Sequence, residues 1–107
     1  MKFSLLLPST TTVQTALNRC GYATFRDPNT GETSYVRRFG QYFYPRFHLY
    51  VQAVTATEAQ CSLHLDMKQP TYIRGHAHSG EYDGENVENE IRRILDVCAS
   101  AEAGEQP

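Results

Sequence analysis

Two neighbouring β-prone runs alternate apolar and polar residues, and their polar positions carry groups that are unusual for an exposed sheet face. These positions are Arg46, His48, Tyr50, Ser62, His64 and Asp66. Alternate residues of a strand share a face, so all six should lie on the face opposite the core. Imidazole and carboxylate groups gathered there could bind a divalent metal ion or transfer protons.

The pairing of the two runs decides which of these residues meet. A turn at residues 55–57 places His48 opposite His64 and Arg46 opposite Asp66. A register shifted by two residues keeps the same faces and places His48 opposite Asp66, but it brings Arg46 beside a lysine. Both registers gather two imidazoles and one carboxylate on a single face.

A second pair of histidines lies in residues 69–86, a stretch with neither helical nor strand periodicity. In an extended chain the spacing of His76 and His78 puts both imidazoles on one side, and the stretch begins close enough to Asp66 to fold back towards the sheet. Zinc is the ion expected for such nitrogen and oxygen donors. The predicted ligands are His64, Asp66, His76 and His78, with His48 in reserve and Tyr50 and Glu81 as polar neighbours.

Two other interpretations of the same residues remain open. In one, the histidines hydrogen-bond to Asp66, Tyr50 or Glu81 on a solvated sheet face and bind no ligand. In the other, His48 and His64 act as general acid and base while arginines stabilise charge, as metal-independent cleavage of a phosphodiester requires. No residue stands out as a nucleophile, so the sequence leaves open whether the protein is an enzyme.

An aromatic and basic run over residues 35–50 suggests a different function. Aromatic rings can stack on unpaired bases while guanidinium groups hold phosphates, so such a run can bind single-stranded RNA or DNA, or associate with the ribosome. The candidate residues are Arg37, Arg38, Arg46, Tyr42 and Tyr44. However, alternation sends Phe47 to the core, and an isoelectric point near 6.0 is low for a nucleic-acid-binding protein.

The net charge of −2 hides an uneven distribution along the chain. Residues 1–78 carry eight basic against four acidic residues, whereas residues 79–107 carry two against eight. Either the acidic segment docks on the basic body, or it stays in solvent and leaves the body free for an anionic partner such as RNA.

Hydrophobic periodicity predicts the elements that position these residues. Thr11 and Gln14 have capping-box spacing at the start of the first helix, and Asp83 is expected to cap the second. The predicted elements are a strand over 3–7, a helix over 11–20, strands over 22–26, 33–39, 46–55 and 59–68, and a helix through 87–98. The sequence therefore predicts an α+β fold: a four-stranded antiparallel sheet of two hairpins with an N-terminal and a C-terminal helix packed on one face. In an alternative, the hairpin over 22–39 is displaced, which would resemble small RNA-associated folds.

Length and cysteine usage indicate one domain over residues 1–98, followed by a flexible acidic tail over 99–107. Three cysteines, Cys20, Cys61 and Cys98, are widely spaced and fall on apolar faces, which favours buried thiols and a reducing, cytoplasmic location. No apolar run approaches the roughly 20 residues that span a bilayer, so no membrane association is expected.

The segments HLDMKQPTY (64–72) and HAHSGEYDGENVENEIRRI (76–94) together resemble a pattern, HLDxKxPxY…HSGEYxG, found in a family of small bacterial proteins. The resemblance covers about a third of the chain. It implies a small, stand-alone bacterial protein and carries over no activity, cofactor or site residue.

Overall fold

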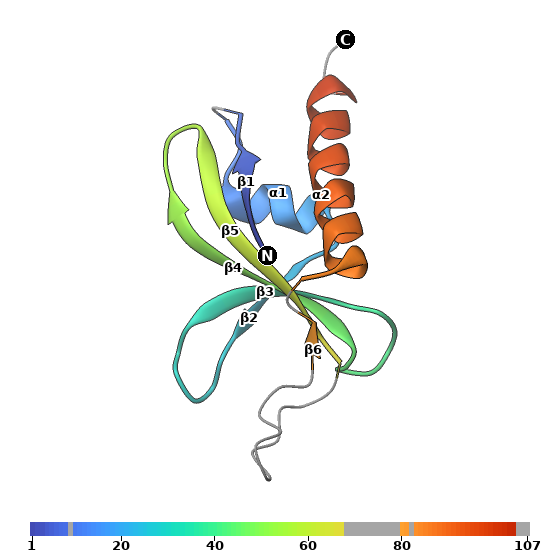
Figure 1. The fold of residues 1–107 in the computed structure, drawn as a ribbon. Coiled ribbons are helices and arrows are strands. Elements are labelled where there is room, and N and C mark those ends of the chain that lie inside the picture. The colour runs from blue at the N-terminus through green and yellow to red at the C-terminus, as the bar shows by residue number, and fades with distance from the viewer. Residues whose placement is uncertain (9, 68–79, 82, 105–107) are drawn as a thin grey trace, which may run out of the picture.

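The computed structural model describes residues 1–8, 10–67, 80–81 and 83–104 (Figure 1). Its elements in chain order are β1 (Lys2–Leu6), α1 (Val13–Arg19), β2 (Ala23–Arg26), β3 (Thr33–Arg38), β4 (Arg46–Val54), β5 (Glu58–Asp66), β6 (Gly80–Glu81) and α2 (Glu85–Gly104). The fold is α+β with an antiparallel sheet, as the sequence predicts. None of the helices in these residues is long and apolar enough to cross a membrane.

The sheet has the strand order β1-β5-β4-β3-β2, so the prediction of four strands is wrong. β1 pairs antiparallel with β5, with Phe3 opposite Cys61 and Leu5 opposite Ala59. This pairing extends the apolar face of β5 by one strand, which explains why an apolar N-terminal run joins the sheet. The two-residue strand β6 pairs with the far end of β5 at Leu65 and Asp66.

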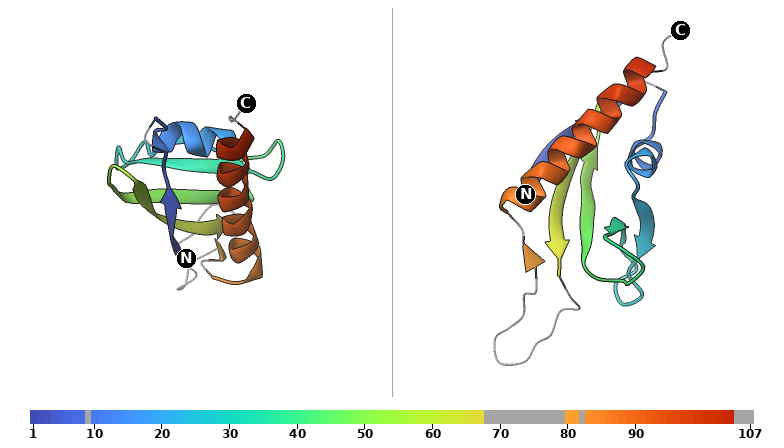
Figure 2. Two further views of the ribbon diagram at one scale, coloured as in Figure 1. Left: turned by 90° about the horizontal axis from the view of Figure 1, so that it is seen from above. Right: turned by 90° about the vertical axis from the view of Figure 1, so that its right-hand side faces the viewer.

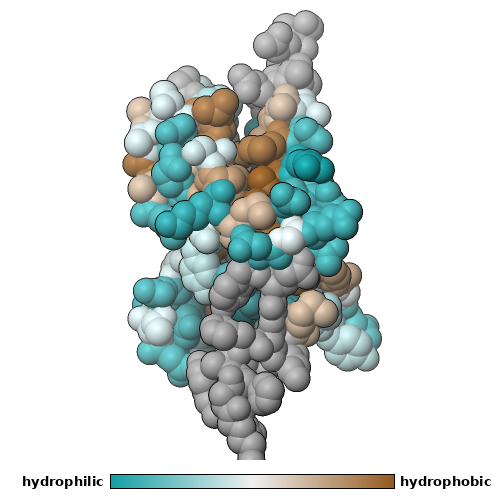
Figure 3. Space-filling model, viewed as in Figure 1, coloured by the Kyte–Doolittle hydropathy of each residue, from teal (hydrophilic) through white to brown (hydrophobic). Residues whose placement is uncertain are grey.

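One hydrophobic core joins both helices to the sheet. It contains Leu17 of α1 and Ile94 of α2 together with the inward-facing Leu5, Leu49 and Leu63, all with at most 1% of their surface exposed. Figure 2 shows α2 crossing obliquely over the strands. On the face shown in Figure 3, apolar side chains are visible between the strands and α2, and hydrophilic ones cover the outer side of the helix.

The helix ends differ in detail from those predicted. Thr12, not Thr11, caps α1, because its Oγ1 accepts a hydrogen bond from the backbone N–H of Thr15 at 3.1 Å. At the start of α2, the Gly84 carbonyl accepts the first helical hydrogen bond, from Glu88, so Gly84 occupies the position predicted for Asp83. α2 continues past Cys98 to Gly104, into the stretch where a tail is predicted.

The first hairpin turns where the sequence predicts. The Asp27 carbonyl accepts a hydrogen bond from Gly31 N–H at 2.8 Å, and Asp27 N–H donates to the Glu32 carbonyl. Gly31 has φ of +75°, a left-handed conformation that costs glycine little. This turn brings β2 beside β3 and so places Phe25 directly opposite Ser34.

Candidate metal centre

The register of β4 and β5 is the first of the two predicted. His48 lies opposite His64, Arg46 opposite Asp66, and Tyr50 opposite Ser62. The pairing becomes irregular only beyond Val51, where the ladder shifts by one residue, so the polar pairs are unaffected. The prediction that two imidazoles and a carboxylate gather on this sheet face is therefore confirmed, but the prediction that the face is exposed is wrong for Arg46 and His48, which are buried.

Asp66 is the centre of the polar cluster. Its Oδ1 lies 2.8 Å from Nε2 of His64, and its Oδ2 lies 3.1 Å from Nδ1 of His48 and accepts a hydrogen bond from Nε of Arg46 at 3.0 Å. Burial raises the pKa of Asp66, but the hydrogen bonds from His48, His64 and Arg46 outweigh it and hold that pKa well below its usual range. Asp66 is thus an ionised carboxylate between two imidazoles.

The cluster is closed on one side and accessible on the other. The side chains of Arg46 and His48 are 6% and 8% exposed, whereas those of Asp66 and His64 are 14% and 16% exposed. A small ion can therefore approach from the side of His64 and Asp66, and His48 lies at the bottom of the site. In the part of the chain that the structure describes, His48, His64 and Asp66 are the one group of three His, Cys, Asp or Glu side chains that could hold a metal ion. Their donor atoms all lie within 4.8 Å of one another.

Aromatic side chains form the closed side. The guanidinium carbon of Arg46 lies 5.0, 4.5 and 4.7 Å from the ring centroids of Phe25, Phe43 and Tyr44. These cation–π contacts hold the guanidinium against Asp66, although its Nη1 is buried without a hydrogen-bond partner. A fixed positive charge here keeps Asp66 ionised.

Tyr50 orients both imidazoles. Its ring stacks on His48 with centroids 4.4 Å apart and lies 5.5 Å from the His64 ring. The two imidazoles are themselves 5.1 Å apart. The site is therefore held in place by ring packing as well as by hydrogen bonds to Asp66.

Ser34 of β3 belongs to the site, and the sequence analysis missed it. Its Oγ lies 2.7 Å from Nε2 of His48 and 3.5 Å from the Phe25 carbonyl, to which it can donate a hydrogen bond. The order Ser34–His48–Asp66 has the connectivity of a nucleophile triad. Yet Ser34 is only 2% exposed, so no substrate reaches its hydroxyl in this structure. Strand alternation marks Ser34 as sharing a face with Val36, but only the β3–β4 register shows that this face carries His48.

Other predicted site residues lie elsewhere or outside the described part of the chain. His76 and His78 lie outside the described residues, and of Glu81 only the backbone, in β6, is described. A paired-histidine phosphodiesterase needs two imidazoles facing the substrate. Here one nitrogen of each imidazole is directed at Asp66.

The nucleic-acid candidates do not form one surface. Arg37 pairs with Glu90 of α2 on the helix side of the sheet, and Arg46 is buried against Asp66 on the opposite side. Arg38 is exposed with its guanidinium 4.9 Å from the Phe43 ring centroid, and Tyr42 is 72% exposed. Tyr44 is half-buried over Arg46. Two of the three arginines are therefore occupied by internal ion pairs.

The group of His48, His64 and Asp66 could therefore hold a metal ion. Its most accessible donors are an ionised carboxylate and an imidazole, and its arginine is turned inward. Comparison of the chain with protein-family models, with curated proteins and with solved structures finds no match.

Proposed function

We propose that this protein binds one divalent metal ion, zinc, through His48, His64 and Asp66. The observation that carries the proposal is the spacing of the three donors: one ligand atom each from His48, His64 and Asp66 lie within 4.8 Å of one another, and Nε2 of His64 lies 2.8 Å from Oδ1 of Asp66. Ligand atoms about 2.0–2.2 Å from a tetrahedral zinc ion lie about 3.4 Å apart. Small side-chain movements would therefore bring the three donors to the spacing that the ion requires.

A histidine that binds a metal ion through one ring nitrogen usually forms a hydrogen bond through the other, and Ser34 is placed to form that bond with His48. In the neutral tautomer with the proton on Nδ1, His48 donates to Asp66, and its Nε2 accepts a hydrogen bond from the Ser34 hydroxyl. When Nδ1 binds the ion, the proton moves to Nε2, and the Ser34 oxygen accepts from it while its hydroxyl donates to the Phe25 carbonyl. Rotation of one hydroxyl thus serves both states.

The two oxygens of Asp66 have separate roles in this proposal. Oδ1, beside His64, is on the more exposed side and would bind the ion, while Oδ2 keeps its hydrogen bond with Arg46. Three protein ligands leave a fourth position for water or another side chain, and the sequence expectation for that position is His76 or His78. The proposal itself depends only on the three described ligands.

We expect wild-type protein without a histidine tag, stripped with chelator and dialysed against zinc, to retain about one ion per chain. Zinc should be measured by elemental mass spectrometry, and affinity by competition with a chromogenic chelator. His64→Ala should weaken binding at least about 100-fold because it removes the most exposed imidazole. Binding should also weaken on acidification, since protons compete for the imidazoles.

The matched control is Gln60→Ala, which alters the same strand and face but removes no ligand. The double variant His76→Ala/His78→Ala shows whether the sequence-predicted pair supplies the fourth ligand. Less than about 0.1 ion per chain in zinc-loaded wild type, or undiminished binding in both His64→Ala and His48→Ala, would contradict the proposal.

Ser34→Ala is expected to weaken zinc binding about 10-fold while leaving all three ligands in place. The reason is that Nε2 of His48 then loses the partner that fixes its protonation state and ring orientation. Ser62→Ala, the same change on the same sheet face opposite Tyr50, should leave affinity unchanged. Equal affinities for the two variants would show that Ser34 has no part in the site.

A further inference from the structure

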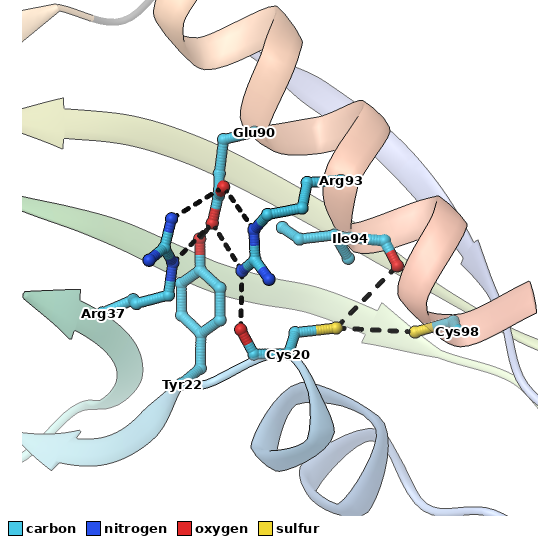
Figure 4. A network of polar contacts seen from close by, with 7 residues as sticks. All are labelled: Cys20, Tyr22, Arg37, Glu90, Arg93, Ile94 and Cys98. Carbon is cyan, nitrogen blue, oxygen red and sulfur yellow. Dashed lines mark hydrogen bonds and ion pairs between the residues drawn. The ribbon is translucent and has the colours of Figure 1, made fainter. Parts of the chain in front are cut away.

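Two cysteines far apart in sequence meet on the opposite side of the sheet, between the helices. The Sγ atoms of Cys20 and Cys98 lie 3.7 Å apart across a sequence separation of 78 residues (Figure 4). Cys20 follows the last residue of α1, and Cys98 lies in α2. The metal site uses neither residue.

The surroundings of the two thiols differ in a way that favours reaction. The hydrogen bond with Cys20 lowers the pKa of Cys98, and the charges of Arg19 and Arg93 lower it further against the effect of burial, to about 7. The hydrogen bond with Cys98 raises the pKa of Cys20, as do its burial and the nearby Glu90, although Arg93 opposes them. Cys98 is therefore the more acidic thiol of the pair.

The two thiols also differ in their exposure to solvent. Cys20 is 2% exposed, whereas Cys98 is half-buried. The third cysteine, Cys61, is buried in β5, and burial raises its pKa to about 11. A small oxidant therefore reaches Cys98 first, and Cys61 stays a thiol.

We propose that Cys98 and Cys20 form a peroxide-sensitive pair that closes into an intramolecular disulfide. In the first step the Cys98 thiolate attacks one oxygen of hydrogen peroxide: an S–O bond forms, the O–O bond breaks, and the departing hydroxide takes a proton to become water. In the second step the Cys20 sulfur attacks the Cys98 sulfenic acid. The S–S bond forms, the S–O bond breaks, and the hydroxide leaves as water with the Cys20 proton.

The fold can accommodate the bond. The sulfur atoms must approach from 3.7 Å to about 2.05 Å, which needs less than about 1 Å of movement from each side. The disulfide would join the end of α1 to α2 beside the Cys20 carbonyl, which already accepts a hydrogen bond from Arg93 at 2.6 Å. Oxidation would therefore lock the contact between the helices, and a dithiol reductant would release it.

The test treats wild-type protein with a small excess of hydrogen peroxide and counts thiols after denaturation. We expect the count to fall from three to one, and peptide mapping to find Cys20 linked to Cys98. The melting temperature should rise by about 8 °C or more, because the bond closes a long loop in the unfolded chain. Dithiothreitol should reverse both changes.

Three variants locate the chemistry. Cys61→Ala should still form the bond, and Cys98→Ala should lose no thiol to peroxide. Cys20→Ala should stop at the sulfenic acid, which dimedone traps on Cys98. Wild-type protein that keeps three thiols, or that forms links through Cys61 or between chains, would overturn the proposal whether or not any variant folds.

Discussion

Glu90→Ala is expected to lower the free energy of unfolding by about 2–3 kcal/mol, a large share of the stability of a domain this size. Glu90 is 4% exposed and accepts hydrogen bonds from the Tyr22 hydroxyl at 2.6 Å, from Nε and Nη2 of Arg37 at 3.0 and 3.1 Å, and from Arg93 at 2.8 Å (Figure 4). Alanine leaves all three donors without their acceptor. Two of them are cations, which makes the loss larger than that of a neutral hydrogen bond.

Urea unfolding measures the effect, and two variants calibrate it. Glu88→Ala removes an exposed carboxylate from the same helix and should change stability by no more than about 0.5 kcal/mol. Tyr22→Phe removes one donor while keeping the ring, and should cost about 1 kcal/mol. If the free energies of unfolding of Glu90→Ala and Glu88→Ala were equal, the hydrogen bonds from Tyr22, Arg37 and Arg93 to Glu90 would not stabilise the fold.

The pH dependence gives the same prediction a second readout. Burial raises the pKa of Glu90, but the hydrogen bonds from Arg93, Arg37 and Tyr22 outweigh it and hold the pKa at about 2. The unfolded chain binds this proton near pH 4.3, so the stabilisation is complete above about pH 5 and is lost as pH falls towards 2. Glu90→Gln should therefore lose less stability than wild type over that interval.

The site could be predicted because its geometry follows from a strand period of two. A one-residue slip between β4 and β5 would put Leu49 and Leu63 on opposite faces of the sheet and turn one of them out of the core, so burial allows only even shifts. His48, His64 and Asp66 then meet without any further information. That part of the site needed no contact beyond one hairpin.

The remaining features depend on contacts between elements distant in sequence. Ser34 reaches His48 only because β3 pairs with β4, and Cys20 meets Cys98 only because the two helices cross. Spacing did carry a signal for Glu90, which falls between the buried Val87 and Ile94 on the apolar side of α2. Leu95, which follows Ile94, is 39% exposed and so lies at the edge of that apolar side. Helical spacing predicts which residues line the apolar side of a helix, but it does not predict how far that side extends around the helix.

Asp66→Asn is expected to destabilise the protein by about 2–4 kcal/mol even in the presence of chelator. The substitution keeps the shape of the side chain but removes the negative charge that faces Arg46 and the two imidazoles. Arg46 is 5% exposed and enclosed by aromatic rings, and its Nη1 already has no hydrogen-bond partner. Its buried charge would then face a neutral amide, which can accept a hydrogen bond from Nε but supplies no negative charge.

A double-mutant cycle separates this loss from loss of the metal ligand. Arg46→Met/Asp66→Asn removes both charges and should recover at least half of the stability that Asp66→Asn loses, because no unpaired cation remains. The double variant should still fail to bind zinc, since its ligand is gone. Arg46→Met alone should bind zinc, because all three ligands remain. If Asp66→Asn is as stable as wild type in the presence of chelator, then Asp66 does not offset the buried charge of Arg46. Zinc binding would then be the remaining role for a carboxylate at this position.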